Sequence, residues 1–329
     1  MSRTLRAQHD SFPLSQPFRI SRGVKTQAEV VTVELAQGGV VGRGEGVPYA
    51  RYGESIESAL AGIEDVRVAL EGGADRAQLL GLLPPGAARN ALDCALWDLE
   101  ARLSGRTVAA KIGAPEPERL ISALTIGIDS PMTMAVAASR IADAPLIKVK
   151  VDATIPDTQI RAVRNAAPNA KLIVDPNESW DQQLVRAMQV VLVALRVDLL
   201  EQPVPADADE WLEDFTPEVP ICADESVHVT ADLDQVARRY QVVNVKLDKS
   251  GGLTEALALA RGARERGLGL MTGCMISSSL SIAPALHIAR MSDFVDLDGP
   301  IWLREDRPGG VRDEAGRLWP PQPGFWGTL

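Results

Sequence analysis

The 329-residue sequence is poor in aromatic residues, in cysteines and in long apolar runs, and each shortage excludes a class of protein. Aromatic residues make up 4% of the chain and the net charge is −10, so neither a base-stacking surface nor a basic patch for nucleic acid is expected. Cys94, Cys222 and Cys274 form no CxxC pair, which argues against a disulfide framework or a thiolate zinc site and favours a reducing compartment. Residues 1–18 lack the apolar core of a secretory signal, and no run of about 18 apolar residues is present that would span a membrane. We therefore expect a cytoplasmic protein without a nucleic-acid or membrane partner.

The N-terminal third of the chain has the pattern of a small α+β unit. Between residues 18 and 45, apolar alternation predicts antiparallel strands joined by a turn at Gly38–Gly39. Apolar residues at helical spacing follow from Ile56 to Ile63, and residues 91–97 belong to a second helix. We predict that residues 1–115 form this unit.

The next part of the chain is periodic. Short apolar runs recur at intervals of 22 to 28 residues, and each run closes on one residue of this series: Thr125, Lys150, Asp175, Glu201, Asp224, Lys246, Cys274 and Asp296. Helical patterns lie between the runs, as in residues 184–195. Eight strand–helix periods fit a (β/α)₈-like barrel at residues 116–298 better than an open sheet. A Pro/Gly-rich segment, residues 299–329, follows the last strand, and we expect it to pack back on the N-terminal unit.

Six of the eight strand ends carry a charge, and barrel enzymes place their catalytic side chains at these ends. Asp175, Glu201 and Asp224 end three consecutive strands, where their mutual repulsion would drive protonation unless a cation sits among them. All-oxygen ligands favour Mg²⁺, with Mn²⁺ as the alternative. Asn177 could support this site, whereas Glu225 should point elsewhere if its strand continues. The alternative is that each carboxylate caps a helix or forms a salt bridge at the rim.

Three lysines complete the predicted rim. Lys148 and Lys150 flank Val149, so the period of two along a strand points both ammonium groups into the barrel mouth. Lys246 ends a strand four places further round and faces them. We expect burial and neighbouring positive charge to lower the pKa of a lysine enough for it to act as a base. One lysine would remove a proton α to a carboxylate and the other would return a proton to the opposite face. Alternatively, Lys148 and Lys150 only neutralise the carboxylates.

Five spaced motifs make the sequence similar to the enolase superfamily. They are KVK at 148–150, DPN at 175–177, EQP at 201–203, ADES at 223–226, and NVK followed by SGG within 244–252. The lysine pair together with the lysine of the sixth strand resembles the muconate-lactonizing-enzyme subgroup. The resemblance covers nearly the whole chain, including PYARYGES at 48–55. It implies a (β/α)₇β modified TIM barrel with an α+β N-terminal capping domain that the C-terminal segment completes, and one Mg²⁺ per subunit.

Within this subgroup the sequence is most similar to bacterial L-Ala-D/L-Glu (dipeptide) epimerases. The distinguishing residues are Asp296 and Asp298, which in that family hold the α-ammonium group of the dipeptide. Taken alone, they would instead suggest an acidic turn before Gly299-Pro300.

The resemblance assigns a role to each matching residue. It makes Lys150 and Lys246 the bases, Asp175, Glu201 and Asp224 the metal ligands, Lys148 the partner of the substrate carboxylate, Thr125 and Cys274 lining residues, and Arg22 the partner of a glutamate side chain. Pro176 departs from the small residue usual between the metal ligand and Asn177, and residues 276–279 vary among relatives. Substrate specificity is expected to rest on the loops near Arg22 and Arg51 and on residues 274–279.

Two other readings stay open. The first is a different reaction of the same subgroup, such as N-acylamino-acid racemisation, o-succinylbenzoate synthesis or muconate cycloisomerisation. The second is a non-catalytic small-molecule binding protein on the same scaffold. For a dipeptide epimerase, family analogy implies peptidoglycan recycling, and the preferred dipeptide and a homo-oligomeric state are left undecided.

Overall fold

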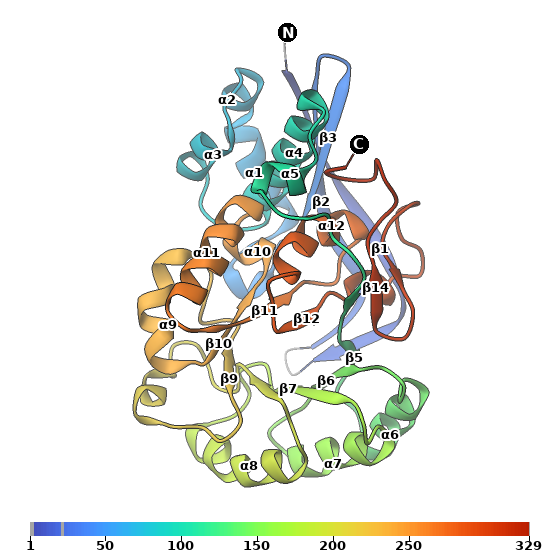
Figure 1. Cartoon of the computed structure of the whole chain (residues 1–329), viewed down its shortest axis with the longest axis vertical. Coiled ribbons are helices and arrows are strands. Elements are labelled where there is room, and N and C mark those ends of the chain that lie inside the picture. The colour runs from blue at the N-terminus through green and yellow to red at the C-terminus, as the bar shows by residue number, and fades with distance from the viewer. Residues whose placement is uncertain (1–2, 21–22, 329) are drawn as a thin grey trace.

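Eight parallel strands form the main sheet, and each strand lies beside the one that precedes it along the chain (Figure 1). The structure is a computed structural model that describes residues 3–20 and 23–328. The strands are β5 (Leu124–Ile126), β6 (Leu146–Lys150), β7 (Lys171–Asp175), β8 (Leu199–Glu201), β9 (Ile221–Ala223), β10 (Val242–Val245), β11 (Gly269–Gly273) and β12 (Phe294–Asp296). The backbone amide of Ala123, beside β5, donates to the carbonyl of Val295 in β12 at 2.8 Å. This bond joins the first strand to the last and closes the sheet into a barrel.

Helices connect successive strands and cover the outside of the barrel. They are α6 (Pro131–Arg140), α7 (Pro156–Ala166), α8 (Gln182–Ala194), α9 (Leu233–Arg239), α10 (Leu247–Ser250), α11 (Leu253–Glu265) and α12 (Ser279–Ala289), with 3₁₀ turns η2 (Glu210–Asp214) and η3 (Thr230–Asp232). Only η2 links β8 to β9, and a short 3₁₀ turn, η4 (Gly299–Trp302), follows β12 in place of an α-helix. The predicted (β/α)₇β barrel is confirmed.

The predicted strand ends agree closely with the observed ones. Four strands, β6, β7, β8 and β12, end at the predicted Lys150, Asp175, Glu201 and Asp296. The other four end within one residue of the prediction, which is the usual uncertainty of a strand boundary. The apolar periodicity was therefore sufficient to locate the rim of the barrel.

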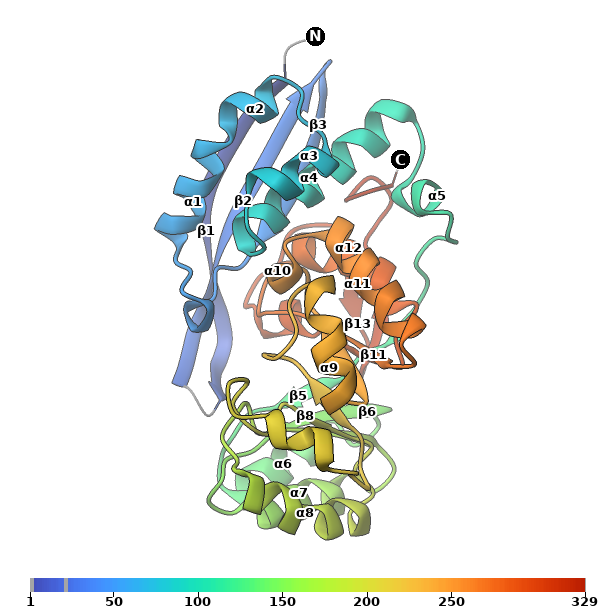
Figure 2. The same cartoon turned by 90° about the vertical axis from the view of Figure 1, so that its left-hand side faces the viewer.

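An antiparallel sheet and a group of helices form the second part of the fold (Figure 2). Its strands are β1 (Arg3–Ile20), β2 (Gly23–Gln37) and β3 (Val40–Gly46), and its helices are η1 (Ala50–Tyr52), α1 (Ile56–Asp65), α2 (Arg67–Glu71), α3 (Arg76–Leu82), α4 (Ala87–Ser104) and α5 (Val108–Ile112). The sequence prediction placed the first strand too late, since β1 begins at Arg3. Only Leu5 and Leu14 of β1 are buried, so the strand gives almost no apolar alternation.

The long helix α4 packs directly on β2 and β3. Val33 of β2 and Leu92 and Leu96 of α4 are fully buried in the same apolar cluster. Gly44 of β3 permits this close approach, because a Cβ there would stand 2.0 Å from the carbonyl oxygen of Ala91. The missing side chain thus sets the distance between sheet and helix.

The C-terminal segment returns to the antiparallel sheet, as expected. Arg307 contacts Glu45 of β3 at 2.9 Å and Asp10 of β1 at 3.1 Å, and the Glu45 side chain is fully buried. The indole nitrogen of Trp326 donates to the carbonyl of Arg43 at 2.9 Å. The C-terminal segment therefore completes the capping part of the fold. The numerical domain limits, 1–115, 116–298 and 299–329, stay a prediction.

A second small sheet joins this segment to the start of the barrel. It consists of β13 (Arg312–Asp313), β14 (Arg317–Trp319) and β4 (Leu120–Ile121). Within the described residues, none of the helices combines the length and the apolar character that crossing a bilayer would need.

The β1–β2 hairpin reaches from the antiparallel sheet towards the barrel mouth (Figure 2). Near its end, the backbone amide of Ile128 donates to the carbonyl of Arg19 at 3.2 Å, which ties the hairpin to the segment after β5. The hairpin thereby covers the rim on which the charged residues lie.

We expect Arg307→Met to lower the free energy of unfolding by about 3 kcal/mol, because it leaves the buried Glu45 carboxylate without its cation. Urea unfolding followed by circular dichroism measures this change. Arg161→Met is the matched control: its exposed i,i+4 pair with Asp157 should contribute no more than about 0.5 kcal/mol. Equal stability of the two variants would contradict the proposed tie between the C-terminal segment and β3.

Candidate active site

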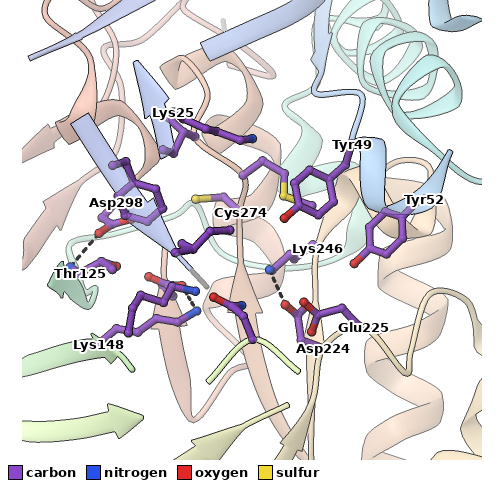
Figure 3. A pocket seen from close by; sticks show the side chains of 17 residues that line it. Lys25, Tyr49, Tyr52, Thr125, Lys148, Asp224, Glu225, Lys246, Cys274 and Asp298 are labelled. Carbon is purple, nitrogen blue, oxygen red and sulfur yellow. Dashed lines mark hydrogen bonds and ion pairs between the residues drawn. The ribbon is translucent and has the colours of Figure 1, made fainter. Parts of the chain in front are cut away.

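A cavity lies at the carboxyl ends of the barrel strands, beneath the β1–β2 hairpin (Figure 3). The barrel contributes Thr125, Lys148, Lys150, Asn177, Asp224, Glu225, Lys246, Cys274, Met275, Ile276, Asp296 and Asp298, and the capping part contributes Phe18, Ile20, Lys25, Tyr49 and Tyr52. We call the charged barrel side of this cavity the floor. We call its other side, formed by Phe18, Ile20, Lys25, Tyr49, Tyr52, Met275 and Ile276, the roof.

The floor contains most of the predicted site residues. All three predicted lysines, both aspartates after β12, Thr125 and Cys274 line the cavity. Of the predicted metal ligands, Asp224 lines it, whereas Asp175 and Glu201 are fully buried and reach it through ion pairs with the floor lysines. Arg22 lies outside the described residues, so its predicted role stays a prediction.

Lys148 links several carboxylates at once. Its ammonium nitrogen lies 3.1 Å from Asp175 Oδ2, 2.7 Å from Glu201 Oε2 and 2.8 Å from Asp296 Oδ2. Lys150, two residues further along β6, pairs with Asp175. Because alternate residues of a strand share a side, both lysines face the same carboxylate.

Asp224 has its own pair of lysines on the other side of the floor. Lys246 Nζ contacts its Oδ2 at 2.7 Å, and Lys249 Nζ contacts its Oδ1 at 2.6 Å (Figure 3 shows the first of these). The sequence analysis missed Lys249. Its signal is the spacing of three residues from Lys246 at the start of α10, since one helical turn returns the side chain to the same strand end.

The ion pairs set the charge state of the floor. Burial favours the neutral acid, but Lys150 and Lys148 outweigh it and lower the pKa of Asp175 to about 2. Burial likewise opposes ionisation of Asp224, yet Lys246 and Lys249 hold its pKa well below the usual range. For Glu201, burial and the nearby Asp175 raise the pKa. Glu201 is therefore the carboxylate with the least compensated charge.

The expected lowering of the lysine pKa is not observed for Lys246 and Lys148. Burial lowers the pKa of Lys246, but Asp224 outweighs it and leaves the pKa raised above its usual value. Lys148 behaves in the same way, because Asp296 and Glu201 outweigh its burial and raise its pKa. The sequence argument weighed burial and neighbouring positive charge, whereas the carboxylates paired with these two lysines decide the direction of the shift.

The donor set fits a hard divalent cation, although the carboxylates are now engaged by lysines. Within residues 3–20 and 23–328, no three acidic, histidine or cysteine side chains stand together as a ready metal cage. The shared contacts of Lys148 show that Asp175 and Glu201 converge on one positive charge. Asn244 fixes Glu201, since its side-chain amide donates to Glu201 Oε1 at 2.8 Å. Buried, oriented carboxylates from adjacent strands are the ligand type that Mg²⁺ prefers.

The two aspartates after β12 differ in their environments. Asp298 Oδ2 accepts hydrogen bonds from the Thr125 backbone amide at 2.9 Å and from the Trp302 indole at 3.3 Å. Burial and the neighbouring Asp296 raise the pKa of Asp298 to about 6. In contrast, Asp296 Oδ1 is a buried acceptor for which the described part of the chain offers no donor. Asp296 is therefore equipped to receive a donor from a bound molecule.

Two further observations correct or extend the sequence analysis. Glu225 was expected to point away, but it lines the cavity beside Asp224, because β9 already ends at Ala223 and strand alternation no longer applies (Figure 3). The roof residues Tyr49 and Tyr52 were not assigned, although both lie in the PYARYGES stretch.

A bidentate ion pair holds the tyrosine-bearing loop against the barrel. Arg51 Nε and Nη2 each lie 2.9 Å from a carboxylate oxygen of Glu178, which follows β7. Glu178 also accepts from the backbone amide of Ala206 at 3.0 Å, so one side chain connects three loops. This contact fixes the position of the roof above the floor.

Known families match both parts of the chain. Residues 2–113 match the N-terminal domain of the mandelate racemase/muconate lactonizing enzyme family, and residues 133–325 match the enolase C-terminal domain-like family. Together these matches cover most of the sequence.

Similar proteins of known activity also align over almost their whole length. The L-Ala-D/L-Glu epimerase of Escherichia coli K12 is 48% identical, over 96% of this chain and 99% of that protein. An N-acetyl-D-glutamate racemase from a Pseudoalteromonas species is 43% identical, over 91% of this chain and 95% of that protein.

Two solved structures have the same architecture. An enolase family member from Agrobacterium tumefaciens, with bound sodium and L-Ala-L-Glu, superimposes with a TM-score of 0.96 at 44% identity and covers 98% of this chain and 99% of that one. The dipeptide epimerase of Methylococcus capsulatus, complexed with Mg and L-Arg-D-Lys, gives a TM-score of 0.90 at 32% identity over 99% of both chains.

We expect Mg²⁺ to raise the melting temperature, because a cation that binds only the folded carboxylates stabilises by mass action, by about 2.7 kcal/mol at 100 times its dissociation constant. Glu201→Gln keeps the shape of the side chain and removes its charge, so the Mg²⁺-dependent shift should nearly vanish. Glu210→Gln, an exposed position in η2, is the control and should retain the shift. Thermal scans across a Mg²⁺ titration measure it, and equal shifts in both variants would exclude Glu201 from the metal site.

Proposed function

The chain belongs to the mandelate racemase/muconate lactonizing enzyme family of enolase-like barrel proteins, and from this premise we propose that it is a Mg²⁺-dependent dipeptide epimerase of the L-Ala-D/L-Glu type. It inverts the α-carbon of the C-terminal residue. The observation that carries the proposal is one cavity in which the lysines of β6 and Lys246, just after β10, lie together with Asp296 and Asp298 at the end of β12.

The charges of the floor match the charges of a dipeptide. Lys148 offers an ammonium group to the terminal carboxylate, and Asp296 Oδ1 offers an acceptor to the α-ammonium group. The backbone amide of Thr125 donates to Asp298 and positions this carboxylate beside Asp296. A dipeptide held at both ends in this way presents its C-terminal α-carbon between Lys150 and Lys246.

Asp175, Glu201 and Asp224 are the residues that would hold the metal. When bound, Mg²⁺ supplies positive charge that stabilises the negative charge developing on the substrate carboxylate and lowers the pKa of the nearby lysines. The chain itself supplies the ligands, which Lys150, Lys246 and Asn244 orient.

Lys150 and Lys246 transfer the protons. One takes the α-proton as a neutral amine and the other donates a proton to the opposite face, after which the substrate leaves with inverted configuration. Each lysine has a carboxylate partner in the floor, Asp175 for Lys150 and Asp224 for Lys246. These partners orient the amines and stabilise whichever one carries the proton.

A second candidate function is racemisation of an N-acylamino acid, which the similar Pseudoalteromonas protein favours. That reaction needs the same lysines and metal ligands but has no α-ammonium group to bind. The buried acceptor of Asp296 favours the dipeptide over the acyl compound. o-Succinylbenzoate synthesis, muconate cycloisomerisation and a non-catalytic binding role have no comparable supporting observation.

A cytoplasmic location is part of the proposal, supported by the three cysteines, all free thiols. Peptidoglycan recycling and a homo-oligomeric state stay predictions.

In D₂O with Mg²⁺ and L-Ala-L-Glu, we expect the NMR signal of the glutamate α-proton to disappear and the L-Ala-D-Glu diastereomer to accumulate. EDTA should stop both changes. Lys150→Ala and Lys246→Ala should each reduce epimerisation by about 10²- to 10⁴-fold, since each removes an acid–base group.

The single variants Lys150→Ala and Lys246→Ala test directly whether the two lysines act on opposite faces of the α-carbon. Each should still exchange the α-proton of one diastereomer, and the two should retain opposite ones, while the double variant exchanges neither. Lys171→Ala, an exposed lysine at the other end of β7, is the control and should be fully active. A wild-type protein that exchanges no L-Ala-X dipeptide would overturn the proposed function.

Asp296→Asn should lower kcat/KM for L-Ala-L-Glu by about 10- to 100-fold, because the amide can no longer pair with the α-ammonium charge. N-acetyl-L-glutamate lacks that charge, so its turnover, where present, should be much less affected. Parallel kinetics with both substrates measure the difference. An equal loss on both would show that Asp296 acts through Lys148 instead of recognising the ammonium group.

A further inference from the structure

Asp248, two residues after Lys246, attaches this end of the barrel to the capping part of the fold. It belongs to α10, which lies beside the amino-terminal end of α4 (Figure 2), and its side chain is buried. Asp248 Oδ1 accepts hydrogen bonds from the side-chain amide of Asn90 in α4 and from the backbone amide of Val47, just after β3, each at 2.8 Å. One carboxylate oxygen therefore holds two segments of the capping part.

Arg89 of α4 makes a second attachment to the same turn. Its guanidinium group donates to the carbonyl of Ser250 at 2.6 Å and to the carbonyl of Gly251 at 3.1 Å. A Cβ at Gly251 would stand 2.5 Å from Arg89 Nε, and a Cβ at Gly252 would stand 2.5 Å from the side chain of Asp93. The two glycines of the SGG motif thus allow α4 to pack directly on the turn that follows Lys246.

These attachments reach Lys246 through the backbone. The carbonyl of Lys246 accepts hydrogen bonds from the Ser250 amide at 3.0 Å and from the Ser250 hydroxyl at 2.8 Å. Ser250 is therefore bonded to Lys246 on one side and to Arg89 on the other. Because Asp248 is held as well, the backbone from which the Lys246 side chain projects is fixed by α4.

The backbone of Lys150 is held in a different way. Lys150 is the last residue of β6 and pairs in register with Asp175 of β7. The pairing continues past it, since the amide of Val151 donates to the carbonyl of Asp175 at 3.2 Å. In contrast, β10 ends at Val245, one residue before Lys246. The two lysines of the proposed reaction thus depend on different parts of the fold, Lys150 on the barrel sheet and Lys246 on the helix of the capping part.

Resting on the proposed function, we infer that Asp248, Asn90 and Arg89 are positioning residues for Lys246, through which α4 controls proton transfer on one face of the substrate α-carbon. In the parts of the chain that the structure describes, these three side chains lie outside the lining of the cavity, so they act through Lys246. A displacement of a reacting group by about 1 Å can cost about 100-fold in rate. Loss of the attachments therefore slows the step of Lys246 and spares the step of Lys150.

The test measures the initial rate of α-proton exchange in D₂O for L-Ala-L-Glu and L-Ala-D-Glu separately. The diastereomer that Lys246→Ala no longer exchanges defines the face that Lys246 serves. Asp248→Ala should slow the exchange of this diastereomer by about 10- to 100-fold and leave that of the other nearly unchanged. The assays use saturating Mg²⁺, so that an effect of the variant on metal affinity does not enter the comparison.

A conservative variant and a matched control accompany Asp248→Ala. Asp248→Asn keeps an oxygen acceptor and should restore the exchange, because burial raises the pKa of Asp248 to about 7 and makes the neutral amide a close substitute. Asp98→Ala is the control: Asp98 is a buried carboxylate of the same helix that accepts from the backbone amides of Arg43 at 3.0 Å and Gly327 at 2.8 Å. It should lower stability and leave the ratio of the two exchange rates at the wild-type value.

Arg89→Met provides a second variant, which removes the bonds to Ser250 and Gly251 and should shift the ratio in the same direction. A wild-type ratio in the folded variants, whether both diastereomers slow equally or neither slows, would show that α4 has only a structural role and would overturn this inference. The proposed function would then stay intact. It fails instead if the wild-type protein exchanges neither diastereomer.

Discussion

The repulsion among the buried carboxylates at the carboxyl ends of β7, β8 and β9 is the constraint on which the rest of the site depends. The three carboxylates, Asp175, Glu201 and Asp224, are almost completely buried. Without nearby cations, their burial and their mutual repulsion would both disfavour the charged form. Lysines from both sides of the barrel mouth compensate this negative charge. Lys148 and Lys150 come from β6, and Lys246 and Lys249 come from the start of α10. An acid–base pair on two flanks of one anionic centre is a consequence of this compensation. The lysines that compensate the buried carboxylates thus include Lys150 and Lys246, the two that transfer protons in the proposed reaction.

The same constraint explains why the pKa values of Lys148 and Lys246 are raised. Buried carboxylates hold each of these two amines as an ammonium ion: Asp224 pairs with Lys246, and Asp296 and Glu201 pair with Lys148. A divalent cation competes with the lysines for these oxygens, so metal binding and the release of a neutral amine are coupled. Glu201, which shares Lys148 with Asp175 and Asp296, has the weakest compensation and a raised pKa. The lysines therefore leave part of the carboxylate charge to be compensated by a bound cation.

The sequence was sufficient for the parts of the structure that repeat. Eight apolar runs located the ends of the barrel strands to within one residue, because a buried parallel strand must be apolar and its end must be polar. The sequence was insufficient where the position of a residue in the fold does not follow from the local apolar pattern. Strand β1 is mostly exposed and shows little alternation, so its start at Arg3 was missed. Lys249 and Glu225 lie just past strand ends, where a turn, and not the strand period, sets the side-chain direction. Lys25 depends on the hairpin folding over the barrel, a long-range contact that no local pattern contains.

The division between floor and roof has a consequence for how such proteins differ from one another. The floor comes from the barrel strands, whose ends are fixed by closure of the sheet and by the ion pairs of the carboxylates. The roof comes largely from β1, β2 and the tyrosine loop, which touch the barrel through a few contacts such as Arg51–Glu178. A substitution in the roof can therefore change the side chain that is accepted without disturbing the acid–base groups. The Methylococcus protein, with nearly the same fold and a basic dipeptide bound, is the kind of relative this separation allows. In this chain the acid–base groups of the proposed reaction come from the barrel, whereas the roof comes from the cap together with Met275 and Ile276.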